Sequence, residues 1–180
     1  MSRRLTLGSF QRRNARIFTQ ANDRHYCPEW MVLKMYRFYS KLLGCSLGGS
    51  VRADYYLTMV LSWSCGLANT LHINLERLGN SPYLPTENPT TSSSLNEALL
   101  SMGGSIAELG ETVTFFTGTN NTVFLNGIKT YLFVSIMHTC AVAQFLDIDL
   151  GDEFRKCFGK GCPKCHFPIC DCGFLPAKVM

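Results

Sequence analysis

Hydrophobic residues recur at helical spacing along four stretches of the chain, each time leaving one face of the helix for polar residues. The first stretch follows Pro28, and proline is favoured in the first turn of a helix. The third follows Ser94 and has Glu97 three residues after that serine, which is the signature of a capping box. The stretches are residues 30–43, 52–78, 95 to about 116, and 123 to about 150, with 149–158 continuing or bending the last one. This pattern predicts an all-α fold.

A segment rich in proline, asparagine, threonine and serine, residues 80–94, separates the first two stretches from the last two. We therefore predict two helical hairpins, at about 28–79 and 94–152. Residues 56–75 and 131–150 also align without a gap at an offset of 75 and share seven of twenty residues. Two such hairpins can each cover the apolar stripe of the other, which predicts a four-helix bundle over residues 27–156.

Two long uncharged runs, Tyr55 to Leu75 and Thr130 to Leu146, lie inside the predicted helices. Polar residues interrupt both runs, and the second is shorter than the roughly 20 residues that span a bilayer. Helices buried on several sides within a bundle have the same composition. We therefore expect no membrane-spanning segment.

Five cysteines fall within residues 157–180, and four of them form two close pairs around a short turn that contains proline. Four thiolates at this spacing can surround one tetrahedral ion, and zinc is its natural occupant. So short a segment has almost no core, and metal binding would supply its folding energy. The alternative is a disulfide-linked or disordered tail. We predict a zinc knuckle with four ligands, Cys162, Cys165, Cys170 and Cys172.

The 180 residues are 46% hydrophobic, as in a single globular domain. The net charge of +4 is not by itself evidence for a nucleic-acid partner. The charge is unevenly distributed, because residues 1–24 hold six arginines and a single acid, Asp23. Such a segment is typical of mitochondrial targeting, so we predict a mitochondrial protein with a basic segment at residues 1–26. The alternatives are a solvated terminus and a basic arm that binds RNA phosphates through its arginines. The arginines proposed for RNA are Arg3, Arg4, Arg12, Arg13 and Arg16.

Residues 145–150, Phe-Leu-Asp-Ile-Asp-Leu, are followed by the motifs Cys-Pro-Lys-Cys and Pro-Ile-Cys-Asp-Cys. Together they resemble the C-terminal part of MazG-like, all-α nucleotide pyrophosphohydrolases, in which the second hairpin ends in a turn of this kind. Residues 67–75 resemble the same turn. The resemblance covers about residues 50–78 and 95–172. It implies a four-helix, MazG-like bundle of two hairpins.

The resemblance also implies a Mg²⁺ site made of two acidic pairs on facing helices, which would bind a nucleoside triphosphate and activate water. Glu108 and Glu111 fit the first pair, and Glu97 is a further candidate. The second pair would fall near Tyr131 and Val134, and neither position is acidic. We therefore interpret the catalytic site as dismantled, and we favour a protein without enzyme activity over an active enzyme.

Three functions follow as hypotheses. The first is a non-catalytic structural or assembly component, with protein partners, of a mitochondrial complex associated with a ribosome or RNA. The second is a Mg²⁺-dependent nucleoside triphosphate pyrophosphohydrolase that uses the three glutamates, completed by Asp147, Asp149 or a partner chain. The third is a zinc-knuckle module that binds RNA bases on exposed aromatic rings. The aromatic residues and lysines near the knuckle are Phe158, Phe167, Phe174, Lys156, Lys160 and Lys164.

Overall fold

The computed structural model describes residues 6–45, 52–78 and 92–170, and for residues 19–25 it describes the backbone alone. Within these ranges the chain forms seven helices and no strand, so the predicted all-α class is confirmed. The helices are α1 (Leu7–His25), α2 (Pro28–Gly44), α3 (Ala53–Thr70), α4 (Leu75–Leu78), α5 (Leu95–Thr119), α6 (Val123–Phe145) and α7 (Leu150–Phe158).

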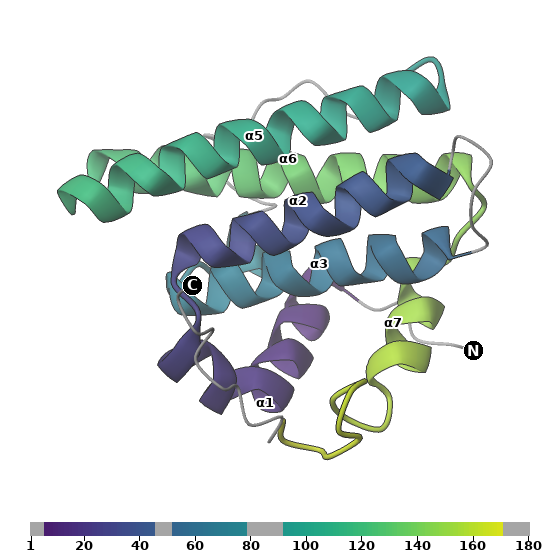
Figure 1. The fold of residues 1–180 in the computed structure, drawn as a ribbon, viewed down its shortest axis with the longest axis horizontal. Helices are drawn as coiled ribbons and strands as arrows, with labels where there is room; N and C mark the ends of the chain where they lie inside the picture. The colour runs from purple at the N-terminus through teal and green to yellow at the C-terminus, as the bar shows by residue number, and fades with distance from the viewer. Residues whose placement is uncertain (1–5, 46–51, 79–91, 171–180) are drawn as a thin grey trace, which may run out of the picture.

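The helices lie in layers, as Figure 1 shows. Helix α5 packs along α6, and α2 packs along α3. The α2–α3 hairpin contacts the α5–α6 hairpin through α2 with α5 and through α3 with α6. Helices α1 and α7 cover the other side of α3 (Figure 1). Helices α2 and α3 therefore form the central layer of the described residues, and much of the core lies around them.

The helix limits correct three of the predictions. Residues 52–78 do not form one helix, because α3 ends at Thr70 and the short α4 begins at Leu75. The fourth predicted helix also ends early, at Phe145, and the alternative that residues 149–158 bend is confirmed, because α7 turns away from α6 by 103°. Helix α5 continues beyond the expected end to Thr119. Its predicted start is confirmed, because the Ser94 hydroxyl accepts a hydrogen bond from the Glu97 backbone N–H.

The sequence repeat corresponds to a repeated backbone turn. Helix α3 is followed by His72 at φ 54°, and α6 is followed by Asp147 at φ 53°. In each case the next residue, Ile73 or Ile148, donates its N–H at 2.8 Å to a carbonyl five residues earlier, as in a Schellman motif. The side chains of Asn74 and Asp149 then each accept a backbone N–H three residues further on. Both turns thus stop one helix and direct the chain into the next.

Helix α1 is part of the folded body, although the sequence suggested a separate basic segment. Phe10 is only 6% exposed, and its ring lies edge-on to Phe154 with 4.6 Å between centroids. The buried Asn14 amide donates to the Ser62 carbonyl and hydroxyl, each at 2.9 Å. Arg13 donates to the carbonyls of Phe158 and Gly159, at the end of α7. Residues 7–18 therefore belong with the bundle.

No single helix of the described ranges is long and apolar enough to cross a membrane. Helices α6 and α7 together meet the length and composition required, but as a bent pair.

Two adjacent glycines of α5 give a matched test of this packing. A Cβ on Gly103 would collide with the Tyr39 phenol, which donates to the Leu99 carbonyl at 2.9 Å, whereas a Cβ on Gly104 would meet nothing within 4 Å. We expect Gly103→Ala to lower the free energy of unfolding by about 1–2 kcal/mol, since overpacking outweighs the gain in helix propensity. We expect Gly104→Ala to raise it by about 1 kcal/mol. Urea denaturation measures both, and equal effects would contradict the α2–α5 contact.

Candidate metal centre

The Cys-rich segment folds into a tight loop directly after α7. Gly161 lies at φ 117°, and a Cβ there would collide with the Phe167 carbonyl, so the position requires glycine. The Cys162 N–H donates to the Phe167 carbonyl at 2.9 Å, and the His166 N–H donates back to the Cys162 carbonyl at 2.8 Å. These two hydrogen bonds close the Cys-Pro-Lys-Cys turn and hold Cys162 and Cys165 on the same side of it.

The loop brings three of the four predicted ligands together. The sulfurs of Cys162, Cys165 and Cys170 all lie within 4.8 Å of one another, close enough to bind one metal ion. Cys162 and Cys170 are buried and Cys165 is half-buried. A tetrahedral ion with sulfur ligands at about 2.3 Å needs sulfurs about 4 Å apart, so the trio fits this geometry. The fourth predicted ligand, Cys172, lies outside the described residues.

The other cysteines that the structure describes do not join this cluster. Burial raises the pKa of the Cys65 thiol to about 12, and burial also raises the pKa of Cys140 and of Cys157. A raised pKa disfavours the thiolate that binds metals. Cys65 and Cys140 are instead packed into the core or against it.

The cysteine loop is attached to α1. The Cys170 N–H donates to the Ile17 carbonyl at 2.6 Å, and the rings of Phe18 and Phe158 lie edge-on with 5.9 Å between centroids. Ile17 itself is buried. A bound ion would therefore hold the loop after α7 against a helix about 150 residues earlier in the chain.

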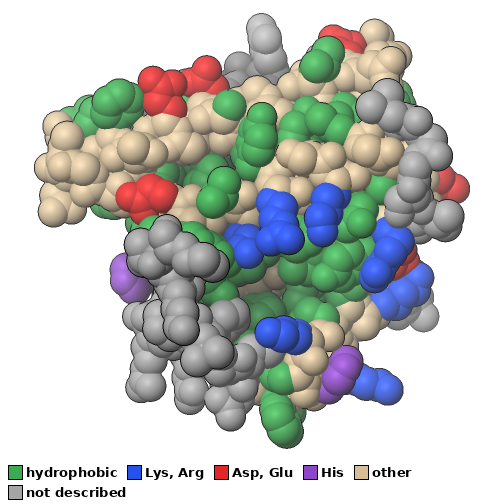
Figure 2. Space-filling view, in the orientation of Figure 1, with side chains coloured by type: hydrophobic (Ala, Val, Ile, Leu, Met, Phe, Trp, Pro, Cys, Tyr) green, Lys and Arg blue, Asp and Glu red, His purple; other side chains and the backbone are tan. Residues whose placement is uncertain are grey.

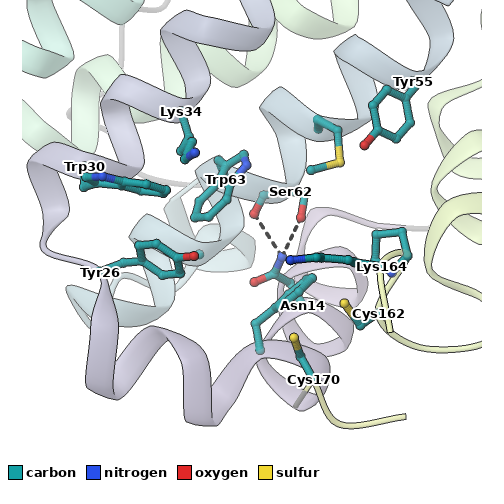
Figure 3. Close-up of a pocket in the computed structure, with 14 residues that line it drawn as sticks. Asn14, Tyr26, Trp30, Lys34, Tyr55, Ser62, Trp63, Cys162, Lys164 and Cys170 are labelled. Atoms are coloured by element: carbon teal, nitrogen blue, oxygen red, sulfur yellow. Dashed lines mark hydrogen bonds between the residues drawn. The ribbon is translucent and has the colours of Figure 1, made fainter. Parts of the chain in front are cut away.

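A pocket with a volume of about 420 Å³ adjoins the centre (Figure 3). Cys162 and Cys170 lie on one wall, and Tyr26, Trp30 and Trp63 lie on the wall across from them. Neighbouring rings pack against each other, with 4.4 Å between the Tyr26 and Trp30 centroids and 5.8 Å between those of the two tryptophans. The residue pattern did not predict this pocket, although Trp30 and Lys34 lie four residues apart on α2, a spacing that places both on one helix face.

Two lysines reach this pocket from different elements, Lys34 from α2 and Lys164 from the cysteine loop (Figure 3). The Lys34 ammonium lies 3.8 Å from the Trp30 ring centroid, a cation–π contact. Burial, with the nearby positive charges of Arg37 and Lys41, lowers the pKa of Lys34. Figure 2 shows this face as an apolar hollow with basic side chains around it.

The acids implied by the MazG-like resemblance are used differently. Glu97 accepts hydrogen bonds from the N–H and hydroxyl of Ser93, just before the capping residue of α5, and these bonds lower the pKa of its carboxyl. Glu108 and Glu111 are exposed on α5, and Asp147 is exposed in the turn after α6. The Asp149 carboxylate caps α7. Among the described residues, the three cysteines form the one group of metal-binding side chains that converges.

The basic residues and aromatic rings proposed for RNA binding fall into several environments. The Arg12 guanidinium forms an ion pair with Glu76 at 3.0 Å, Arg13 caps α7, and Arg16 is exposed. Lys156 pairs with Glu153, while Lys160 and Lys164 are exposed. The ring of Phe158 is fully buried, so it cannot stack on a base, whereas Phe167 is 58% exposed. Arg3, Arg4 and Phe174 lie outside the described residues.

His138 is half-buried on α6. Its Nδ1 lies 3.3 Å from the Ser105 hydroxyl on α5, and burial lowers the pKa of the ring. This contact joins α5 to α6 and leaves the imidazole without an acidic partner among the described residues.

Comparisons with protein-family models, with curated proteins and with solved structures find no match for this chain. The MazG-like resemblance therefore stays a prediction.

Proposed function

We propose that this chain is a non-catalytic, MazG-like helical protein that acts as a structural or assembly component of a larger mitochondrial complex, with a zinc ion fastening its C-terminal segment. The position of the three thiols supports the proposal most directly. All three lie in the loop after α7, which the backbone N–H of Cys170 attaches to α1, and two of the three are buried, as in a closed structural site. Sulfur ligands favour zinc over Mg²⁺ or Ca²⁺.

The two hairpins and their repeated turns support the MazG-like bundle as part of this proposal.

The placement of the carboxylates supports a protein without catalytic activity. The Glu97 carboxylate bonds to Ser93 at the start of α5, Asp149 caps α7, and Glu108 and Glu111 face solvent from a single helix. A Mg²⁺ site for a triphosphate requires carboxylates that converge from different elements.

The tip of the α5–α6 hairpin offers a surface for a protein partner. This tip projects beyond α2 and α3, as Figure 1 shows. Phe115 is 50% exposed and stacks on Phe124 with 5.7 Å between centroids, and Val123 is 73% exposed. Aromatic side chains are enriched among the residues that dominate binding energy at protein interfaces. We therefore place the protein contact of the complex at this tip.

The mitochondrial location rests on the arginine-rich N-terminus. Because α1 covers Phe154 and fastens the cysteine loop, its cleavage after import would uncover the core. We therefore propose that any targeting signal in residues 1–26 is retained in the mature chain.

RNA binding by the cysteine loop is a second candidate function, and one observation favours it. Phe167 is exposed in the same loop as the exposed Lys164, so a ring and a cation are both accessible beside the centre. Zinc knuckles bind unstacked bases with such side chains. RNA in the proposed complex would meet this loop.

The double variant Phe115→Ser, Val123→Ser tests the proposed function. We expect the native 20.2 kDa chain to migrate in a much larger particle in mitochondrial extract, and the double variant to migrate as a free chain. Leu100→Ser, an exposed position of α5 away from the tip, is the control and should remain in the particle. Size-exclusion chromatography with crosslinking measures this. A monomeric native chain, or Mg²⁺-dependent pyrophosphate release that Glu108→Gln abolishes, would contradict the proposal.

A further inference from the structure

The pocket beside the cysteine loop has features that its role in folding does not explain. All of its aromatic side chains come from α1, α2, α3 and the residue after α1, and both tryptophans of the sequence line it. Its volume of about 420 Å³ lies within the range of pockets that bind small molecules. A space of this size between rigid rings is larger than the gaps left by ordinary core packing.

The polar groups of this pocket favour a negative charge. Lys34 and Lys164 line it, no acidic side chain does, and neither lysine forms an ion pair within the described residues.

The two lysines have different positions with respect to the metal centre. Lys164 lies in the same loop as the three cysteines. Lys34 is on α2, across the pocket from the sulfurs (Figure 3). Lys34 is therefore the lysine whose position does not depend on the cysteine loop.

We propose that this pocket binds a small organic anion, whose apolar body lies among Tyr26, Trp30, Trp63 and Met59 and whose anionic group pairs with Lys34. The Lys34 ammonium over the face of Trp30 places a positive charge at the pocket, which favours an anion over a cation. This site is independent of the protein contact at the hairpin tip, so either can fail without the other.

Titration of the full-length, zinc-loaded chain tests the inference. We expect 4-phenylbutanoate to bind, and the neutral 4-phenylbutanamide to bind at least tenfold more weakly, since charge-assisted hydrogen bonds are about twice as strong as neutral ones. Phenyl phosphate, in a parallel titration, shows whether the site prefers a phosphate or a carboxylate. Fluorescence excited at the tryptophans reports on this pocket alone, because both line it. Calorimetry gives the dissociation constants.

Four lysine variants locate the anion. Lys34→Gln should weaken 4-phenylbutanoate at least tenfold, Lys34→Arg should retain most of the affinity, and Lys164→Gln should have a smaller effect than Lys34→Gln. Lys129→Gln on α6, outside the pocket, is the control and should bind as the native chain does. The inference is overturned if neither anion binds at millimolar concentration, if the amide binds as well as the carboxylate, or if Lys34→Gln leaves the affinity unchanged.

Discussion

The variant Cys165→Ser is expected to lose the bound zinc and, with it, the attachment of the cysteine loop to α1. The Cys165 sulfur lies within 4.8 Å of those of Cys162 and Cys170, so its hydroxyl replacement removes one ligand of a shared ion. Structural zinc sites couple metal binding to folding, with apparent binding free energies of about 10–16 kcal/mol in small domains. We expect zinc to fall from about one ion per chain to none, and the free energy of unfolding to fall by several kcal/mol.

The control for this prediction is Cys157→Ser. Cys157 is half-buried on α7, only eight residues from Cys165, and lies outside the cluster, so this variant should keep its zinc. Elemental analysis measures the metal, and thermal unfolding with and without a chelator measures the stability. Stability that responds to a reducing agent but not to a chelator would support the disulfide alternative instead. Loss of RNA affinity in Cys165→Ser, with the helices intact by circular dichroism, would support the RNA-binding candidate.

The variant Phe10→Ala is expected to lower the free energy of unfolding by about 3–5 kcal/mol, the usual cost of removing a buried phenylalanine ring. Phe10 is 6% exposed and contacts Phe154 of α7 edge-on, so the change leaves a cavity between two helices. A separate basic arm would show no such effect. The size of the loss therefore decides whether α1 is part of the domain.

Arg16→Ala is the control on the same helix. Arg16 is exposed, and exposed substitutions away from caps usually change stability by less than about 0.5 kcal/mol. Urea denaturation followed by circular dichroism compares the two variants. If Phe10→Ala unfolds at the same urea concentration as Arg16→Ala, α1 does not pack in solution as the structure shows.

Local sequence patterns predicted the features that depend on neighbours along the chain. The capping serine of α5, the proline at the start of α2 and the equivalence of residues 56–75 and 131–150 all appear in the structure. The closeness of Cys162 to Cys165 in one metal-binding group was also predictable, because two residues between cysteines place both in one turn. Residue periodicity alone missed the breaks after Thr70 and Phe145, because His72 and Asp147 adopt positive φ without the glycine that usually marks such a turn. The resemblance had implied a turn at residues 67–75 and 145–150.

The sequence by itself determined that the protein is helical, that its helices form hairpins, and that a cysteine cluster lies near its C-terminus. Each of these follows from patterns of residue spacing along the chain. The tertiary structure alone decided that α1 belongs to the core and that an aromatic, basic pocket adjoins the cysteines. Those features depend on contacts between distant residues, such as Asn14 with Ser62 and Cys170 with Ile17. The hydrophobic periodicity of the sequence does not predict such contacts, because they form only when distant apolar helix faces pack together in the folded chain.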